Sequence, residues 1–346
     1  MKKLYDNIVA EDKLSTKFKL LKTAKQLDPA KKLIEMIVED MDDNDGNFIQ
    51  QFQSTGFSSR LWEIFLFKFL EENGFNFDRS KNRPDFHVFK NGCDFFVEAS
   101  LSNEVANEKF TKEFILEAQK NKDLRVQNEL IEYYVMRMGS VLFSKLQKKY
   151  WELEWVKNKA LVIAITPAHS YLSSFLPDSK IIEYLYGITY EPKSEEESNI
   201  PVRIVRTDNH RFGEKEIPPV FFQQPDAEYI SAIIFTNNSD LHKFNRMGYQ
   251  NGMSDEFIVM ERGGLAFGGE ALAVEFSQSV IPGEIKEDWN EGVCIFHNPN
   301  ALIPLDHNLF ENIRQIWIDE NGDLDGPMPK FYPFNSITAS VCIDIK

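Results

Sequence analysis

The sequence predicts an α/β protein of the α+β type, with a mixed sheet whose central elements follow the order αβββαβ. Residues 58–74 and 104–151 have helical apolar patterns, and three strand-like runs lie between them, a short one at 74–78 and the two arms of a hairpin at 84–100. Residues 159–166 form an uninterrupted apolar run of strand length that ends at Pro167, as is typical of a central strand. Because a buried strand after a long helix needs a crossover connection, we expect parallel and antiparallel neighbours in one sheet.

The chain of 346 residues exceeds the size that one core usually fills, roughly 250–300 residues. We therefore divide it into a helical N-terminal segment (1–50), a core (51–250) and a β-rich C-terminal region (251–346) packed on that core. Proline, serine and charged residues concentrate near 190–226, which predicts an insertion in the core. Short strand-like runs alternate with turns after residue 256.

Composition limits the classes of protein to consider. The chain has no run of roughly 18 uncharged apolar residues and no apolar stretch after its first lysines, so we expect neither a membrane helix nor a secretory signal. Cys93, Cys294 and Cys342 are odd in number and far apart, which indicates a reduced, cytoplasmic protein. The net charge of −15 argues against non-specific coating of nucleic acid but allows a local basic groove.

The first core helix, at residues 58–74, is apolar on most of its sides and carries Glu63 inside the apolar run. Ser58 or Ser59 can cap its start, and Asn73-Gly74 can end it. A carboxylate in such a helix needs a donor, a cation or a metal as its partner. Two interpretations stay open: a salt bridge with Arg60 or Lys68, or a role for Glu63 in a site.

Residues 84–100 predict a β-hairpin. Asn91-Gly92 stands between two aromatic and β-branched runs, and this pair favours a two-residue turn because both residues must adopt positive φ. Asp85 and His87 share one face of the first strand, and Glu98 and Ser100 share one face of the second. The hairpin could therefore bring the Asp85 and Glu98 carboxylates together.

Two carboxylates held close repel each other unless a cation or a proton lies between them. Their hard oxygen atoms suit Mg²⁺, so the pair predicts a metal site on the hairpin. The structural alternative is that Asp85 caps a turn after Pro84 and Glu98 pairs with a lysine. His87 is either a metal ligand or proton carrier, or a hydrogen-bonded structural residue.

The helical region after the hairpin carries a cation at the end of an apolar stripe. Lys145 is the next member, by helical spacing, of the stripe Tyr134, Met138, Val141, Leu142. A lysine that only covers the edge of the apolar seam with its stem is the alternative to a functional lysine. Arg137, Ser144 and Lys148 form a neighbouring stripe on the same helix.

These elements and residues together resemble the PD-(D/E)XK nuclease superfamily. The resemblance rests on the element order, on Glu63 in the first helix, on Pro84-Asp85, and on Glu98-Ala99-Ser100 thirteen residues later. It covers residues 58–167, about a third of the chain. It implies a metal-dependent nuclease acting on DNA, in bacterial defence or mobile-element biology. It further implies Mg²⁺ or Mn²⁺ as cofactor, held by Asp85 and Glu98, with Glu63 as an additional acid.

The chain departs from the motif at Ser100, where the superfamily has lysine. A hydroxyl group does not supply that positive charge, so an active enzyme needs a cation from elsewhere. Some members place the lysine on the following helix, and Lys145 is our choice, with Lys148 behind it. The alternative is a degenerate module that keeps the fold, has lost hydrolysis, and binds nucleic acid or a protein.

Charge is unevenly distributed along the chain. Residues 120–159 contain nine Lys/Arg and five Asp/Glu, whereas residues 282–346 contain four and eleven. We therefore expect DNA to bind a local basic groove that includes Arg137, Lys148 and Lys149. The acidic C-terminal region favours a protein partner as a second expectation, or autoinhibition by occupying the groove.

Overall fold

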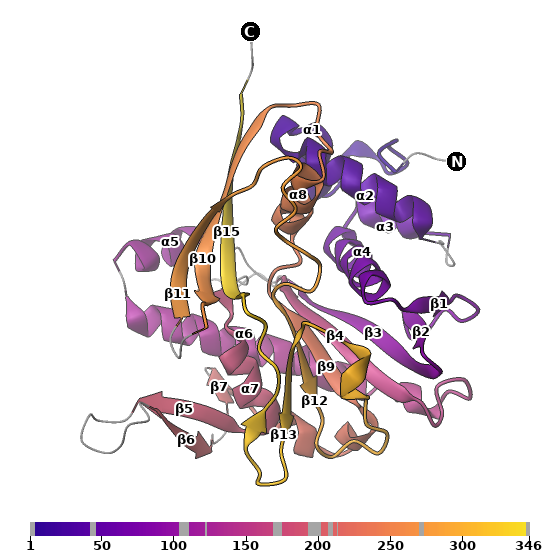
Figure 1. The fold of residues 1–346 in the computed structure, drawn as a ribbon, viewed down its shortest axis with the longest axis vertical. Coiled ribbons are helices and arrows are strands. Elements are labelled where there is room, and N and C mark those ends of the chain that lie inside the picture. The colour runs from indigo at the N-terminus through magenta and orange to yellow at the C-terminus, as the bar shows by residue number, and fades with distance from the viewer. Residues whose placement is uncertain are drawn as a thin grey trace.

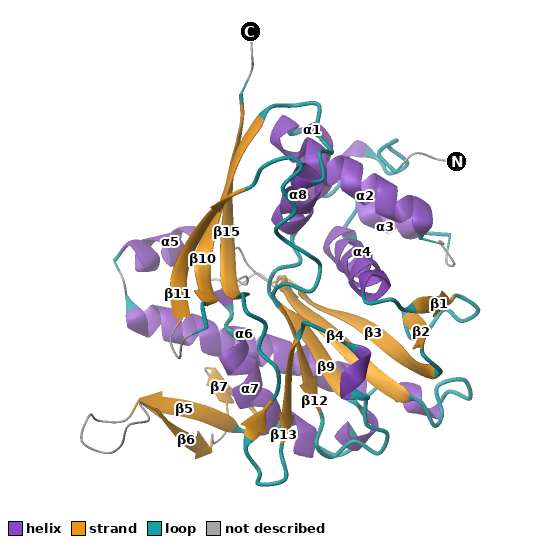
Figure 2. Cartoon of the chain, in the orientation of Figure 1, coloured by secondary structure: helices purple, strands orange, loops and turns teal. Residues whose placement is uncertain are grey.

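A computed structural model gives the fold of the chain (Figure 1). It describes residues 4–41, 46–103, 111–121, 123–168, 175–192, 202–206, 210–212, 214–269 and 273–343. The predicted fold class is confirmed, because helices and a large mixed sheet form the body of the molecule and a second, antiparallel sheet adjoins it (Figure 2). Among the described residues, no helix combines the length and the apolar character that a membrane crossing requires.

The N-terminal segment is helical, as predicted. It forms α1 (Thr16–Thr23), α2 (Asp28–Asp40) and α3 (Phe48–Gln53). Ser15 caps α1 by accepting a hydrogen bond from the Phe18 N–H, and Pro29 stands in the first turn of α2. Leu33, Ile34 and Ile37 of α2 are buried, so this helix packs its apolar side onto the body of the protein.

The core follows the predicted order of elements. They are α4 (Phe57–Glu72), β1 (Asn76–Asp78), β2 (Phe86–Lys90), β3 (Cys93–Asn103), α5 (Lys112–Lys120), α6 (Leu124–Leu146) and β4 (Ala160–Ala168). β2 and β3 pair antiparallel, whereas β3 and β4 pair parallel. The long helical region therefore makes the expected crossover between two parallel strands.

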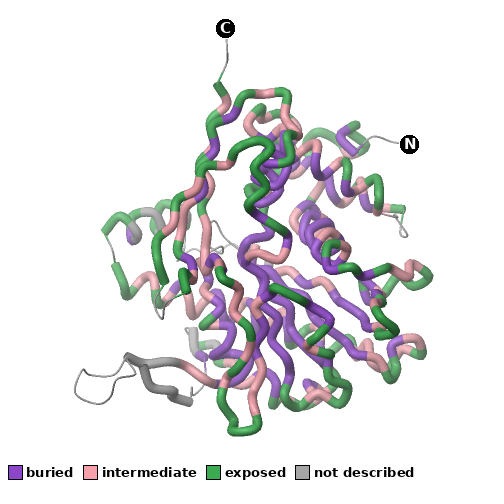
Figure 3. The backbone as a smooth tube through the Cα atoms, viewed as in Figure 1, coloured by how far each residue is buried: buried purple, intermediate pink, exposed green. Residues whose placement is uncertain are grey.

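The main sheet has the strand order β1-β2-β3-β4-β9-β12-β13-β14. β9 (Ala232–Thr236) continues the parallel run from β4, and β12 (Val293–His297) pairs antiparallel with β9. β1 and β2 lie at one edge of this sheet (Figure 1). The central strands are buried along their length (Figure 3), which explains why their sequences are almost continuously apolar.

The β-rich region 251–346 contributes strands to both sheets. Here β12, β13 (Arg314–Ile318) and β14 (Leu324–Asp325) extend the main sheet. The second sheet consists of β10 (Ile258–Phe267), β11 (Ala273–Ser279) and β15 (Tyr332–Cys342). All five residues of β12 are buried, and such a strand needs neighbours on both sides.

The insertion predicted near 190–226 contains two small hairpins. They consist of β5 (Ile188–Pro192) with β6 (Val202–Arg206), and of β7 (His210–Phe212) with β8 (Lys215–Ile217). Part of the insertion lies outside the described residues. The hairpins follow α7 (Asp178–Tyr186), and none of their strands joins the main sheet.

Helices cover both faces of the main sheet. Alternate strand residues such as Val97 and Val162 pack with α2, α4 and α8 (Leu241–Gln250) in one apolar cluster. Their neighbours Phe96 and Ile163 pack with α6 and α7 in another. The period of two along each strand therefore divides the core into two layers, with the sheet between them.

A buried group of charges joins α8 to the second sheet. Glu287 accepts hydrogen bonds from Arg246, at 2.7 and 2.8 Å, and forms an ion pair with Lys243 at 2.8 Å. Arg262 of β10 lies 3.5 Å from the same carboxylate. Burial alone would raise the pKa of Glu287, but the three cations around it hold that pKa well below its usual range. The carboxylate thus neutralises cations that cannot reach water.

Replacing Glu287 with Gln should lower the free energy of unfolding by about 3 kcal/mol or more, because it leaves buried cations without their counter-charge. Denaturant unfolding with an unchanged m-value measures this loss. The matched control is Glu284→Gln. Glu284 and its ion-pair partner Lys286 are both half-exposed, so we expect the free energy of unfolding to change by less than about 1 kcal/mol. Equal effects of the two substitutions would contradict this account of the buried charges.

Candidate active site

The β2–β3 hairpin forms as the sequence predicts. Asn91 and Gly92 adopt φ values of 52° and 80° in the turn, and Phe86 pairs with Val97. The next pair along this register places Asp85 opposite Glu98. The backbone N–H of Ala99 donates a hydrogen bond to Asp85 Oδ2 at 2.7 Å. The hairpin therefore brings the end of the first strand and its carboxylate against the residue that follows Glu98.

Glu98 is buried and has two side-chain partners from the connection between β3 and β4. Lys145 Nζ lies 2.5 Å from Glu98 Oε1 and also donates to the Ala99 carbonyl at 3.2 Å. The Tyr150 hydroxyl donates to the same Glu98 oxygen at 3.1 Å. Lys145 stands in the last turn of α6, where Leu142 and Leu146 pack toward the sheet. The apolar stripe of α6 thus positions the ammonium group beside the carboxylate.

The Asp85 carboxyl group is electrostatically unfavourable in its ionised form. Burial of the carboxyl group and the like charges of Glu98 and Glu63 raise its pKa well above the usual value. The Ala99 N–H and the Lys145 ammonium lower it by less. The Asp85 residue is nonetheless exposed overall, so we attribute its raised pKa mainly to the like charges of Glu98 and Glu63. The positive charge of Lys145 therefore does not offset the negative charge around Asp85.

Glu63 lies on α4, the helix that covers the other face of the sheet from α6. It forms an ion pair with Arg60, which is one of the two partners, Arg60 and Lys68, that the sequence suggests. Its charge still contributes to the raised pKa of Asp85. Glu63 is thus near enough to act on the carboxylate pair through its field, and its role as a metal ligand stays a prediction.

Ser100, where the superfamily motif has lysine, is buried on β3. It follows Glu98 by two residues and so shares its face of the strand, but its hydroxyl has no hydrogen-bond partner among the described residues. The positive charge beside Glu98 comes instead from Lys145, which is 47 residues further along the chain. The structure therefore places a cation beside Glu98 that comes from α6 and not from β3.

The three residues predicted to bind nucleic acid differ in exposure. Lys148 is exposed just after α6, and Arg137 is partly buried on that helix. Lys149 lies 3.4 Å from Asp226 as an ion pair and adopts a left-handed φ of 50°. This conformation turns the chain after the helix and leads it back toward Glu98 through Tyr150.

His87 belongs to a separate polar cluster on the hairpin. Its Nδ1 lies 3.1 Å from Asp78 Oδ2, and its Nε2 lies 2.9 Å from Asp94 Oδ2. Its ring stacks on Phe96 with centroids 4.2 Å apart, and Lys159 pairs with Asp94. With both ring nitrogens already engaged, His87 fits the structural interpretation.

Tyr150 is a residue of this site that the sequence patterns do not identify. It lies in a short 3-10 turn, Tyr150–Glu152, beyond the end of α6. The helical spacing that points to Lys145 stops at the left-handed Lys149, so no periodicity relates Tyr150 to Glu98. Burial, followed by the charge of Glu98, raises the pKa of its hydroxyl, which therefore remains a donor at neutral pH.

A second acidic cluster lies between α6, α7 and β7. Glu132, Glu183 and His210 have potential ligand atoms within 4.8 Å of one another. Lys180, however, reaches both carboxylates, at 3.4 Å from Glu132 and 2.7 Å from Glu183. An ammonium group already lies against these charges, as Lys145 does against Glu98, so this cluster is weak evidence for a metal.

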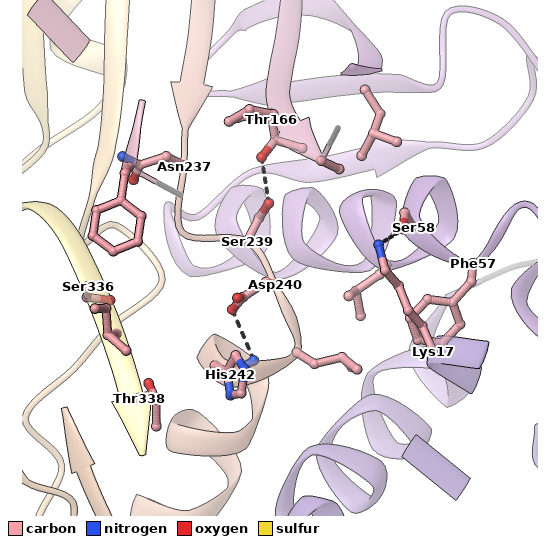
Figure 4. Close-up of a pocket in the computed structure, with 17 residues that line it drawn as sticks. Lys17, Phe57, Ser58, Thr166, Asn237, Ser239, Asp240, His242, Ser336 and Thr338 are labelled. Atoms are coloured by element: carbon pink, nitrogen blue, oxygen red, sulfur yellow. Dashed lines mark hydrogen bonds between the residues drawn. The ribbon is translucent and has the colours of Figure 1, made fainter. Parts of the chain in front are cut away.

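A cavity of about 330 Å³ opens at the carboxyl ends of β3, β4 and β9, and none of Asp85, Glu98 and Lys145 lines it (Figure 4). Its polar groups are largely bonded to one another. Thr166 and Ser239 share a hydrogen bond of 2.8 Å, and Lys17 donates to Ser58 at 3.2 Å. We take the hairpin as the candidate site because Glu98 and Glu63 raise the pKa of Asp85 there, beside the Lys145 ammonium group.

Comparisons of the chain with protein-family models, with curated proteins and with solved structures gave no match. The geometry and the charges of the site are therefore the basis on which a function can be assigned to it.

Adding Mg²⁺ or Mn²⁺ should raise the melting temperature of the protein, since a ligand that binds only the folded state stabilises it, by about 2.7 kcal/mol at a hundredfold excess over Kd. Asp85→Asn and Glu98→Gln should remove this shift. In metal-free buffer at pH 7, Asp85→Asn should melt at no lower a temperature than the wild type. The substitution removes a carboxylate that destabilises the folded state, as its raised pKa indicates.

Differential scanning fluorimetry with and without EDTA measures these shifts. Asp226→Asn is the matched control, since it removes a carboxylate that also pairs with a lysine but lies outside the site. A shift that persists in both site variants would place the metal elsewhere in the chain.

Proposed function

We propose that the protein is a metal-dependent phosphodiesterase that hydrolyses DNA. The observation that carries the proposal is that Asp85, just before β2, is bonded to Ala99 next to Glu98 of β3, with the Lys145 ammonium group on Glu98. Carboxylates in such a pair, with too little positive charge around them, are the usual protein ligands of Mg²⁺. The element order αβββαβ, expected from the resemblance, supports the same proposal.

The carboxylates of Asp85 and Glu98 would hold the metal ion, and the charge of Glu63 would strengthen the attraction. A divalent ion at such a site lowers the pKa of bound water and neutralises charge on the phosphate. The raised pKa of Asp85 fits this requirement, because a site that is short of positive charge gains most from binding a cation.

The remaining residues would position the reacting groups or stabilise the charge that develops on them. Hydrolysis adds water across a P–O bond, and negative charge grows on the phosphoryl oxygens as the bond to water forms. The Lys145 ammonium, fixed by Glu98 and by the Ala99 carbonyl, would supply positive charge at that place or align the water. Tyr150 would hold the Glu98 carboxylate in one orientation through its hydroxyl. Arg137, Lys148 and Lys149 would contact the DNA backbone.

A catalytically degenerate module is the second candidate. It is favoured by the absence of a lysine at Ser100 and by the close ion pair between Lys145 and Glu98, which already neutralises one of the two carboxylates. Such a module would bind nucleic acid, or a protein through the acidic C-terminal region, without a metal requirement. In either case we expect the protein to act in the cytoplasm, because its three cysteines are free thiols.

Purified wild-type protein should cleave supercoiled plasmid or linear DNA in Mg²⁺ or Mn²⁺, and EDTA should stop the reaction. Glu98→Gln and Lys145→Met should each lower the rate by about 100-fold or more, since each removes a group that binds the metal or stabilises developing charge. Agarose gels of timed reactions measure these rates.

The matched control is Lys180→Met, which removes an equally paired lysine from α7 and should retain the wild-type rate. Absence of cleavage by the wild type would rule out the nuclease and leave the degenerate module. Cleavage by Glu98→Gln at the wild-type rate would contradict the assignment of the activity to this site.

A further inference from the structure

The loop that leads into Asp85 is basic. Residues 79–83, which we call the basic loop, read Arg-Ser-Lys-Asn-Arg and contain no acidic residue. Arg79 packs its guanidinium over the rings of Phe67 and Phe77, at 5.2 and 4.8 Å from their centroids. Lys81 and Arg83 are exposed. Two cations therefore reach solvent within four residues of a carboxylate of the site.

The basic loop is held against the same segment that supplies Tyr150. Trp155 Nε1 donates to the Arg83 carbonyl at 2.8 Å, and Lys81 Nζ lies 5.3 Å from the centroid of the Trp155 ring. Tyr150, five residues earlier, donates to Glu98. Residues 150–155 thus connect the basic loop at one end with the buried carboxylate at the other, which gives the loop a defined place beside the site.

Arg83 lies close enough to the site for its charge to be felt there. Burial, Glu98 and Asp85 raise the pKa of the Tyr150 hydroxyl, and Arg83 is the cation that opposes this rise. Arg83 also stands two residues before Asp85 in the chain. An exposed guanidinium group therefore lies near the site.

We propose that the basic loop binds the phosphate backbone of double-stranded DNA at the site, through Lys81 and Arg83. Lysine and arginine contacts to phosphate set the position of a duplex on a protein without reading its sequence. In a chain with a net charge of −15, such a contact needs a local group of cations, and the loop provides one that is separate from α6. Glu152 and Glu154 on the supporting segment are acidic, so the loop itself must carry the contact.

The inference deepens the proposed function, since the DNA that the loop holds would be the substrate of the adjoining carboxylates. The inference relies on the proposed function only for what happens to the DNA after it binds, because phosphate contacts require neither a metal nor hydrolysis. Binding and cleavage can therefore be measured separately.

The experiment compares wild-type protein with the double variant Lys81→Gln/Arg83→Gln in EDTA, which prevents metal-dependent cleavage. Fluorescence anisotropy of a labelled 20-base-pair duplex, titrated at several salt concentrations, gives the affinity and its salt dependence. We expect the double variant to bind at least about tenfold more weakly at low salt. The slope of log K against log salt should become shallower by about 1.8, or about 0.9 for each phosphate that the loop no longer neutralises.

The matched control is Lys13→Gln/Lys330→Gln, which changes the net charge equally at two exposed lysines outside the loop. Both double variants should melt like the wild type, because the Trp155 hydrogen bond uses the Arg83 backbone and not its side chain. An unchanged slope in the loop variant, an equal loss in the control, or no binding of duplex by the wild type would overturn the inference.

The two proposals fail in different ways. Loop-dependent binding by a wild-type protein that never cleaves would contradict the nuclease and support the inference. Metal-dependent cleavage with unchanged binding by the loop variant would support the nuclease and contradict the inference.

Discussion

Repulsion between Asp85 and Glu98 is the constraint on which the site depends. The antiparallel register of β2 and β3 places these carboxylates on neighbouring strands, and the backbone N–H of Ala99 ties Asp85 to the second strand. Two carboxylates at such a place raise the free energy of the metal-free protein unless positive charge compensates them. Lys145 compensates Glu98, whereas Asp85 keeps a raised pKa. An arrangement that disfavours the empty site favours a bound cation, which is the physical case for function here.

The remainder of the fold makes this arrangement rigid. The main sheet has an apolar layer on each face, so β3 and β4 are held from both sides while α6 delivers Lys145 from one of them. The buried charges around Glu287 join α8 to the second sheet. The strain of like charge is therefore confined to one edge of a well-packed core, as is common at functional sites.

Local patterns in the sequence predict the elements well, and long-range pairing much less. Asn91-Gly92 predicts the hairpin because its turn chemistry fixes the register, and helical spacing leads to Lys145 because the apolar stripe of α6 faces the sheet. Tyr150 could not be found in this way, since the chain turns at Lys149 and leaves the helical period. Nor does any local pattern show that β12 pairs with β9, because a buried strand has the same composition in a core sheet as in a separate one.

The central claim is that the hairpin carboxylates form a divalent cation site. Crystals grown with Mn²⁺ test it most directly, through the anomalous difference map collected near the manganese absorption edge. We predict one strong peak between the Asp85 and Glu98 carboxylates, with the Lys145 ammonium shifted from its place on Glu98 or sharing that carboxylate with the ion. A peak among Glu132, Glu183 and His210 alone, with Lys145 still bonded to Glu98 and no peak on the hairpin, would contradict it.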